Sequence, residues 1–210
     1  FISSIENLEK LRLVDSNPEN LLQYGLESPS FQIHLQFKNG DEETLLLGDE
    51  SPIGGSVYLK VKSDPAVILA ATSKENFDKS IYDFRDKTIF NFSTASINRI
   101  QIKRKDKAVN LIKEEEQWKS SGKVEAKADK DSILAFLRDL QFSRIKEFES
   151  ENPESLEPYG LDSPYATLIL EDEKKQSYMI DLGSKKNSSG YYSKKKESPG
   201  IFVVDAKLYN

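Results

Sequence analysis

Four pairs of polar residues recur along the chain at a constant spacing of 135 residues, and they include the groups best suited to chemistry. A carboxylate beside a phenol can act as an acid–base couple. Each set, however, lies in a segment that predicts a capped helical turn, where such side chains complete backbone hydrogen bonds. We therefore assign them a structural role and predict no catalytic residue among them. The pairs are Asn17/Asn152, Glu19/Glu154, Tyr24/Tyr159 and Ser28/Ser163.

His34 is the single histidine of the chain, and Ile169 occupies the equivalent position 135 residues later. A lone imidazole cannot supply the two or three histidines that most catalytic zinc sites use. The chain also lacks cysteine, which excludes disulfides, thiol nucleophiles and cysteine-ligated metals. We predict no metal site and no cofactor, and the residues of any binding site stay unknown at this stage.

Two kinds of loop resemble ligand sites but lack the residues that would complete them. Segment 48–55 is rich in glycine, yet no Gly-Lys-Ser/Thr follows it and its flanks predict two strands. Carboxylates gather at two predicted hairpin tips without the alternating spacing and closing glutamate of a calcium loop. We interpret them as solvated turn charges. These carboxylates are Asp41, Glu42, Glu43, Glu171, Asp172 and Glu173.

Five lysines lie close in sequence to Tyr191 and Tyr192. Basic residues with interleaved tyrosines can hold nucleic acid or anionic lipid headgroups. The formal net charge is −5, however, and the first half of the chain carries far fewer lysines at the equivalent place. We favour a sheet edge protected by lysines and expect no nucleic-acid partner. The lysines are Lys185, Lys186, Lys194, Lys195 and Lys196.

These residues lie within an internal repeat of the sequence. Residues 17–29 and 152–164 are identical at nine of 13 positions, and the same spacing relates Leu47-Gly48 to Leu182-Gly183. After a one-residue deletion, Tyr58 aligns with Tyr192. The 210-residue chain, with 37% hydrophobic and 10% aromatic residues, has the composition of a folded protein. The sequence therefore predicts two copies of one folded unit.

The copies share a predicted order of elements. A helix with Asp129 as N-cap precedes the second signature, and Ile5, Leu8 and Leu11 indicate the remnant of the same helix in the first copy. The signature itself predicts one helical turn, with Pro18 or Pro153 at its first position and Gly25 or Gly160 at its left-handed end. The expected strands are 31–38, 42–48, 57–62 and 66–71, followed by a helix near 74–82, and then 166–171, 177–182, 191–195 and 201–204.

The segment between the copies, 97–118, predicts a charged hairpin without a counterpart in the first copy. We expect that counterpart to be encoded before Phe1, and the final helix of the second copy to follow Asn210. The first repeat unit, lacking its N-terminal hairpin, is assigned to residues 1–93, and the second, with hairpin, helix and antiparallel sheet, to 94–210. The predicted fold class is α+β, a tandem of two similar units, each a mostly antiparallel sheet with helices packed on one side.

Four motifs lie along the chain in this order: the Tyr-Gly-Leu-x-Ser-Pro signature, the stretch 47–58, the Asp83-Phe84-Arg85-Asp86-Lys87 element and Trp118 followed by a helix. Taken together, they resemble a bacterial family, domain of unknown function 4340. The charged residues of 83–87 are expected to form a local ion-pair cluster. The resemblance implies an envelope protein with an N-terminal membrane anchor, related to auxiliary components of transport systems similar to those of gliding motility. It implies no catalytic residue, since the family has no assigned activity.

These observations lead us to expect a non-enzymatic, extracytoplasmic module that binds a protein partner or serves assembly in the cell envelope. Its only membrane attachment would be an anchor outside these residues, because the longest apolar run, 66–71, is far too short to span a bilayer. We see no sequence feature for a small-molecule ligand. The alternative is a carbohydrate-binding or hydrolytic domain that uses carboxylates and tyrosines in a cleft between the two units.

Overall fold

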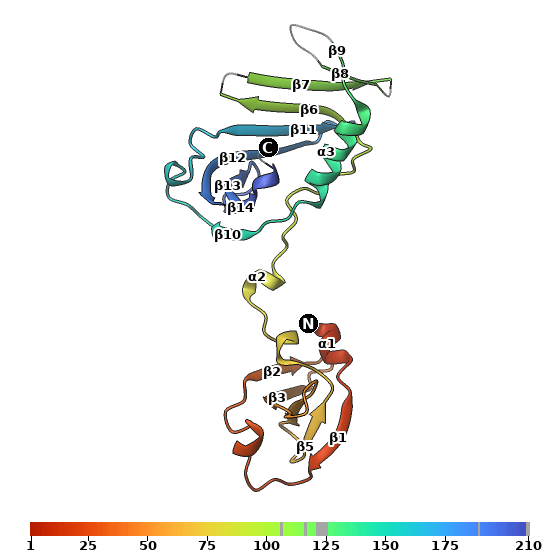
Figure 1. Ribbon diagram of the computed structural model, residues 1–210, viewed down its shortest axis with the longest axis vertical. Coiled ribbons are helices and arrows are strands. Elements are labelled where there is room, and N and C mark those ends of the chain that lie inside the picture. The colour runs from red at the N-terminus through yellow and green to blue at the C-terminus, as the bar shows by residue number, and fades with distance from the viewer. Residues whose placement is uncertain (106, 116, 121–125, 189, 209–210) are drawn as a thin grey trace. The chain divides into compact units, whose positions relative to one another are not determined.

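The computed structural model describes residues 1–105, 107–115, 117–120, 126–188 and 190–208, and it divides into two compact units, Phe1–Phe84 and Arg85–Asn210. Each unit contains one antiparallel sheet and few helical segments (Figure 1). The predicted mostly antiparallel α+β architecture is therefore confirmed.

The first unit contains a five-stranded sheet in the order β1-β5-β4-β3-β2. Its strands are β1 (Lys10–Asp15), β2 (Phe31–Gln36), β3 (Glu42–Glu50), β4 (Val57–Val61) and β5 (Val67–Ala70). Its helices are α1 (Ile2–Glu6) and α2 (Ile81–Phe84), with single 3-10 turns at Leu22–Tyr24 and Lys74–Asn76.

Alternating apolar residues on β2 and β3 produce the first core, as the period of two predicts. Ile33 and Leu47 are buried, whereas His34 is exposed. The predicted Asn-Gly turn joins β2 to β3, and Gly40 has the positive φ of 93° that this turn requires. The buried core residues are Ile33, Leu45, Leu47, Val57, Leu59, Ala70 and Phe77.

The second unit contains a nine-stranded sheet in the order β10-β14-β13-β12-β11-β6-β7-β8-β9. Its first strands are β6 (Ile97–Arg104), β7 (Lys107–Glu114), β8 (Gln117–Ser120), β9 (Ala126–Lys127) and β10 (Glu147–Ser150). The remaining strands are β11 (Ala166–Asp172), β12 (Ser177–Asn187), β13 (Gly190–Lys195) and β14 (Ile201–Asp205). The helix is α3 (Lys130–Phe142), and 3-10 turns lie at Glu157–Tyr159 and Ala206–Leu208.

Helix α3 begins at the predicted N-cap, because the Asp129 side chain accepts a hydrogen bond from the Asp131 N–H. Its apolar residues at helical spacing, Ile133, Leu137 and Leu140, are buried in the core of the second sheet. The predicted hairpin is also present: β6 pairs with β7 on one side and with β11 on the other.

Five strands of the second sheet, β10-β14-β13-β12-β11, follow the same order as the whole first sheet. The pairing registers also correspond when 135 is added to residues of β1, β2 and β3 and 134 to residues of β4 and β5. The corresponding pairs are Leu13↔Ile68 and Phe148↔Phe202, Phe31↔Leu47 and Ala166↔Leu182, Tyr58↔Leu69 and Tyr192↔Val203.

Three local predictions differ from the structure. Leu11 lies in strand β1 and not in a helix, because Leu11 and Leu13 alternate with polar residues at the period of a strand. The helix expected near 74–82 is divided, since the Asp83 side chain accepts from the Ser80 N–H and starts a new turn there. Pro18 and Pro153 precede the signature turns, which start at Leu22 and Glu157.

The segment 85–93 packs in the second unit. Its residues Ile89, Phe90 and Phe92 are buried in the same core as Ile100 and Leu170. The repeat boundary expected between residues 93 and 94 therefore lies nine residues beyond the division between Phe84 and Arg85. The cause is burial, because three large apolar side chains gain more from the second core than from solvent.

Candidate functional site

The signature turns that both copies share are fixed by close backbone contacts. Gly25 and Gly160 end the turns with positive φ values of 66° and 63°, as predicted. The turn then lies against a glycine of the neighbouring strand: a Cβ atom at Gly48 would be 2.1 Å from the Tyr24 carbonyl oxygen, and one at Gly183 would be 2.3 Å from the Tyr159 carbonyl oxygen. These contacts explain why both copies have glycine there.

Each signature tyrosine packs against a second tyrosine in its own sheet. The ring centroids of Tyr24 and Tyr58 are 5.1 Å apart, and those of Tyr159 and Tyr192 are also 5.1 Å apart. The Tyr24 hydroxyl donates to Asp15 Oδ2 at 3.4 Å. Burial and the Asp15 carboxylate raise the pKa of the Tyr24 phenol, which disfavours a role as a base near neutral pH.

Other residues considered in the sequence analysis form contacts or turns within their own sheet. His34 Nδ1 lies 3.0 Å from Thr44 Oγ1 on the next strand. Gly54 and Gly55 adopt positive φ in the loop between β3 and β4. Asp172 Oδ1 accepts the N–H groups of Lys174 and Gln176 at 2.9 and 2.8 Å, which closes the hairpin between β11 and β12.

Two of the lysines near Tyr191 and Tyr192 have separate partners. Lys186 pairs with Glu147 and Glu149, and hydrogen bonds from its ammonium to both carboxylates raise its pKa. Lys195 instead is partly buried and donates to the Thr88 carbonyl oxygen at 2.8 Å. Burial lowers the pKa of the Lys195 amine, while the Asp86 carboxylate opposes that shift.

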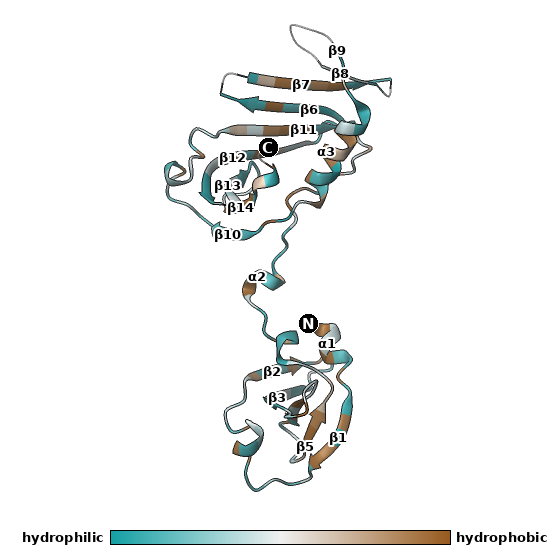
Figure 2. Cartoon of the chain, in the orientation of Figure 1, coloured by the Kyte–Doolittle hydropathy of each residue, from teal (hydrophilic) through white to brown (hydrophobic). Residues whose placement is uncertain are grey.

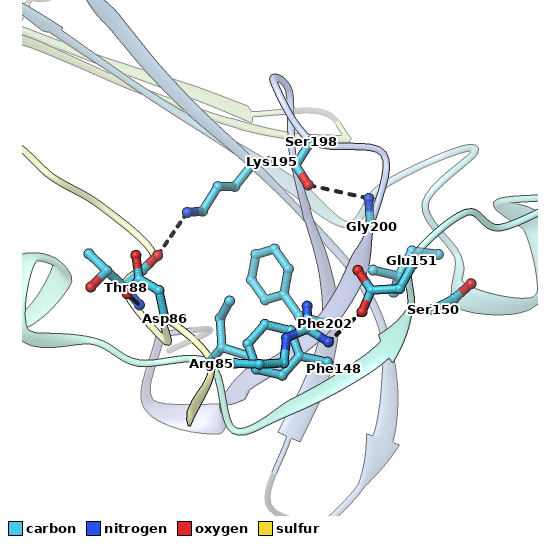
Figure 3. A pocket seen from close by; sticks show the side chains of 12 residues that line it. Arg85, Asp86, Thr88, Phe148, Ser150, Glu151, Lys195, Ser198, Gly200 and Phe202 are labelled. Carbon is cyan, nitrogen blue, oxygen red and sulfur yellow. Dashed lines mark hydrogen bonds and ion pairs between the residues drawn. The ribbon is translucent and has the colours of Figure 1, made fainter. Parts of the chain in front are cut away.

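A hollow of about 190 Å³ with charged walls lies in the second unit. Figure 3 shows Arg85 beside Phe148, and Lys195 pointing toward the segment that carries Asp86 and Thr88. Elements β10, β13 and β14 supply the walls, together with residues that follow the first unit. The lining residues are Arg85, Asp86, Thr88, Ile145, Phe148, Ser150, Glu151, Lys195, Ser198, Gly200, Ile201 and Phe202.

Arg85 is the central contact of this hollow. Its guanidinium carbon lies 3.3 Å from the centroid of the Phe148 ring, a close cation–π contact, and its Nη1 forms an ion pair with Glu151. Asp86 Oδ1 accepts the Thr88 N–H at 2.8 Å. Hydrogen bonds from Thr88 hold the pKa of the Asp86 carboxyl below its usual range, so this carboxylate is charged near neutral pH.

Backbone hydrogen bonds attach the same segment to residues 144–145, which join α3 to β10. The Ile145 N–H donates to the Lys87 carbonyl oxygen at 2.8 Å, and Thr88 forms an antiparallel bridge with Arg144. Both cations of the hollow, Arg85 and Lys195, already have partners. The side chains of the hollow and these backbone bonds therefore hold residues 85–88 against the rest of the second unit.

A family model described as domain of unknown function (DUF4340) matches residues 1–145 and, a second time, residues 118–210. The chain belongs to this family. The two overlapping matches correspond to two tandem DUF4340 copies, in agreement with the resemblance of the sequence. No curated protein and no solved structure matches the chain.

Within the described part of this DUF4340 chain, no group of three His, Cys, Asp or Glu residues is placed to hold a metal ion. The described helices are all too short or too polar to cross a membrane.

Sequence reasoning singled out the Asp83–Lys87 element of the DUF4340 chain but missed its partners. It expected a local ion-pair cluster, whereas Arg85 contacts Phe148 and Glu151, more than 60 residues away. The internal repeat is the sequence signal that identifies position 148 as a strand residue. Position 148 corresponds to Leu13 at the spacing of 135, so an apolar residue recurs at this place in a strand.

Proposed function

We propose that this DUF4340 chain is a non-enzymatic module that binds a protein partner or serves assembly in the cell envelope. The observation that carries the proposal is an apolar surface on strand β1. Leu11 is 55% exposed and Leu13 is 50% exposed. Figure 2 shows brown, hydrophobic parts along β1 of the first unit.

The equivalent position of the second unit differs from Leu13 in its exposure. Phe148, which occupies the register position of Leu13, is partly buried and lies beneath the Arg85 guanidinium. Arg85 thus covers this position in the second unit, whereas Leu13 is half exposed among the described residues. Exposed apolar surface beside polar residues is typical of protein interaction sites.

A further part of the proposal concerns the architecture and the location. We propose that the two units are tandem copies of one structural module with helices on one side, supported by equal strand orders and registers. The resemblance to envelope proteins supports an extracytoplasmic location, an N-terminal anchor and a role auxiliary to a transport or gliding-type system.

The test uses the full-length protein in its native host, with a photo-crosslinking amino acid in place of Leu13. Leu22 is the matched control, because it is an exposed leucine of the same unit on the signature turn, 64% exposed. We expect a crosslinked envelope protein with the probe at position 13 and none with the probe at position 22. Equal yields at both positions, or no adduct at position 13, would contradict the proposal.

Enzymatic activity of the purified chain would contradict the non-enzymatic part of the proposal. The appropriate assay incubates the chain with envelope polysaccharides and measures released reducing ends. We expect no release above that of a heat-denatured sample.

A further inference from the structure

The hollow of the second unit has walls of two kinds. Phe148 and Phe202 supply aromatic carbon, whereas Arg85 and Lys195 supply cationic groups from two separate elements, the segment 85–88 and strand β13 (Figure 3). Its volume of about 190 Å³ is that of about six water molecules in the liquid, so a molecule of about six non-hydrogen atoms has a comparable size. An apolar wall with a few fixed polar groups is the usual composition of a small-molecule site.

Lys195 has more hydrogen-bonding capacity than the protein uses. Its ammonium carries three N–H donors, and one of them donates to the Thr88 carbonyl oxygen at 2.8 Å. The residue is partly buried, and among the described residues no carboxylate lies within ion-pair distance of its ammonium. A desolvated cation without an anionic partner is unfavourable, and burial accordingly lowers the pKa of this amine. An anionic group in the hollow would remove that cost.

Arg85 also keeps donors available. The face of its guanidinium lies on the Phe148 ring, with 3.3 Å between the guanidinium carbon and the ring centroid, whereas its N–H groups point along the guanidinium plane. One of the five N–H donors forms the ion pair with Glu151. Stacking on Phe148 therefore orients this cation and leaves further N–H donors for a ligand.

Two carboxylates also line the hollow, and they limit its affinity for anions. Asp86 accepts hydrogen bonds from Thr88, and Glu151 pairs with Arg85. The formal charges of the two cations and the two carboxylates cancel, so long-range attraction of anions is weak and binding depends on direct contacts with Lys195 and Arg85. For a ligand of this size we expect a dissociation constant on the order of 1 mM.

We propose that this hollow binds a small organic carboxylate, with the carboxylate at Lys195 and Arg85 and a short apolar chain against Phe202. An ionised carboxylate only accepts hydrogen bonds, so it matches the available N–H donors of the two cations. The aromatic wall fits an apolar chain, which an inorganic anion lacks. By strand register, Lys195 corresponds to Val61 of the first unit, so the cationic site belongs to the second copy alone.

The test adds sodium butyrate to the 210-residue chain at constant ionic strength and follows NMR chemical shifts. Butanol is the uncharged probe with the same chain length, and inorganic phosphate is the anion without an apolar chain. We expect saturable binding of butyrate, with the largest shifts at the side chains of Lys195 and Arg85 and at the Gly200 amide. Butanol should bind at least about tenfold more weakly, because it lacks the charge-assisted hydrogen bonds. Phosphate should also bind more weakly, because it buries no apolar surface.

Two variants and one titration provide the second arm. Lys195→Met removes the ammonium and keeps an unbranched side chain, and Lys196→Met is the matched control at the next, exposed lysine. We expect butyrate affinity to fall at least about tenfold for Lys195→Met and to stay unchanged for Lys196→Met. In the parent chain, saturating butyrate should raise the pKa of the Lys195 amine, because a nearby anion favours the charged form. This pKa decides the question if Lys195→Met fails to fold.

Several results would overturn the carboxylate site. These are butyrate shifts that do not saturate, equal binding of butanol, and an unchanged pKa of the Lys195 amine. Phosphate binding as tight as that of butyrate would assign the hollow to inorganic anions and overturn the organic ligand. Equal losses for Lys195→Met and Lys196→Met would indicate general charge attraction and overturn the site as well. The crosslink at Leu13 tests the proposed function separately, because no residue of the hollow takes part in it.

Discussion

Substituting Gly48 or Gly183 by alanine is expected to destabilise the unit that contains it by about 3 kcal/mol. The Cβ atom of an alanine at position 48 would lie 2.1 Å from the Tyr24 carbonyl oxygen, whereas a carbon–oxygen contact needs at least about 3.3 Å. The turn must therefore move by about 1 Å. Overpacking of this kind costs about 1–3 kcal/mol.

Movement of the turn also affects the leucine that follows it. Leu26 is 2% exposed and Leu161 is 5% exposed, and full exposure of a buried leucine costs about 1.5–3 kcal/mol. Partial exposure added to the overpacking gives the total of about 3 kcal/mol. For units of this size, that corresponds to a fall in melting temperature of at least about 10 °C.

The single tryptophan makes the two units distinguishable. Trp118 is buried in the second unit, so its fluorescence reports unfolding of that unit, while far-UV circular dichroism reports both. We expect Gly183→Ala to lower the urea midpoint of the Trp118 signal. Gly48→Ala should lower the circular-dichroism midpoint and leave that of Trp118 unchanged.

The matched control is Gly200→Ala, where the added Cβ would lie 3.3 Å from the Ser150 carbonyl oxygen. We expect this variant to lose less than about 1 kcal/mol. The structural assignment of the shared Leu-Gly pairs would be refuted if Gly48→Ala and Gly183→Ala unfolded at the midpoints of the parent, or no earlier than Gly200→Ala.

Three other variants test the remaining contacts. Tyr159→Ala should destabilise the second unit by about 2 kcal/mol, which is less than the loss of a fully buried ring costs. Tyr159→Phe should change the free energy of unfolding by no more than about 0.5 kcal/mol in the Trp118 urea transition. Equal losses for the two variants would contradict a packing role. Arg85→Ala should lower the free energy of unfolding by about 1 kcal/mol in the same assay, whereas the exposed control Arg138→Ala should cause no measurable change. A smaller loss for Arg85→Ala than for Arg138→Ala would contradict the docking contact. Hydrogen bonds from Ser132 and Asp131 lower the pKa of Asp129 in the folded state. Its stabilising effect is therefore present above the unfolded pKa and is lost as the pH falls through the folded value. The melting temperature of Asp129→Ala should consequently lie below that of the parent at pH 7 and approach it below about pH 3; a constant difference would contradict the capping role.

The sequence was sufficient to predict the elements with strong local signals. Helix α3 combines an N-cap at Asp129 with Ile133, Leu137 and Leu140 at helical spacing. The hairpin of β2 and β3 combines strict alternation with the Asn-Gly turn. Both signals are local in sequence, so they can be read without knowledge of the tertiary partners.

The missed elements depend on partners that are distant in the chain. Strand β10 has four residues and exists because Phe148 pairs with Phe202 of β14. The role of Arg85 likewise depends on Phe148 and Glu151. A short charged segment gives no periodic signal that would identify such contacts, and only the repeat relates position 148 to Leu13.

Amide hydrogen exchange of the 210-residue chain, followed residue by residue by NMR, tests most directly the claim that β2 and β11 occupy equivalent places in two copies of one sheet. We predict fast exchange for the outward amides Gln32, His34 and Gln36, and slow exchange for Ile33 and Leu35, which face β3. Their equivalents on β11, Thr167, Ile169 and Glu171, should exchange slowly because β6 covers them. Slow exchange at Gln32, His34 and Gln36, or fast exchange at their β11 equivalents, would contradict this claim.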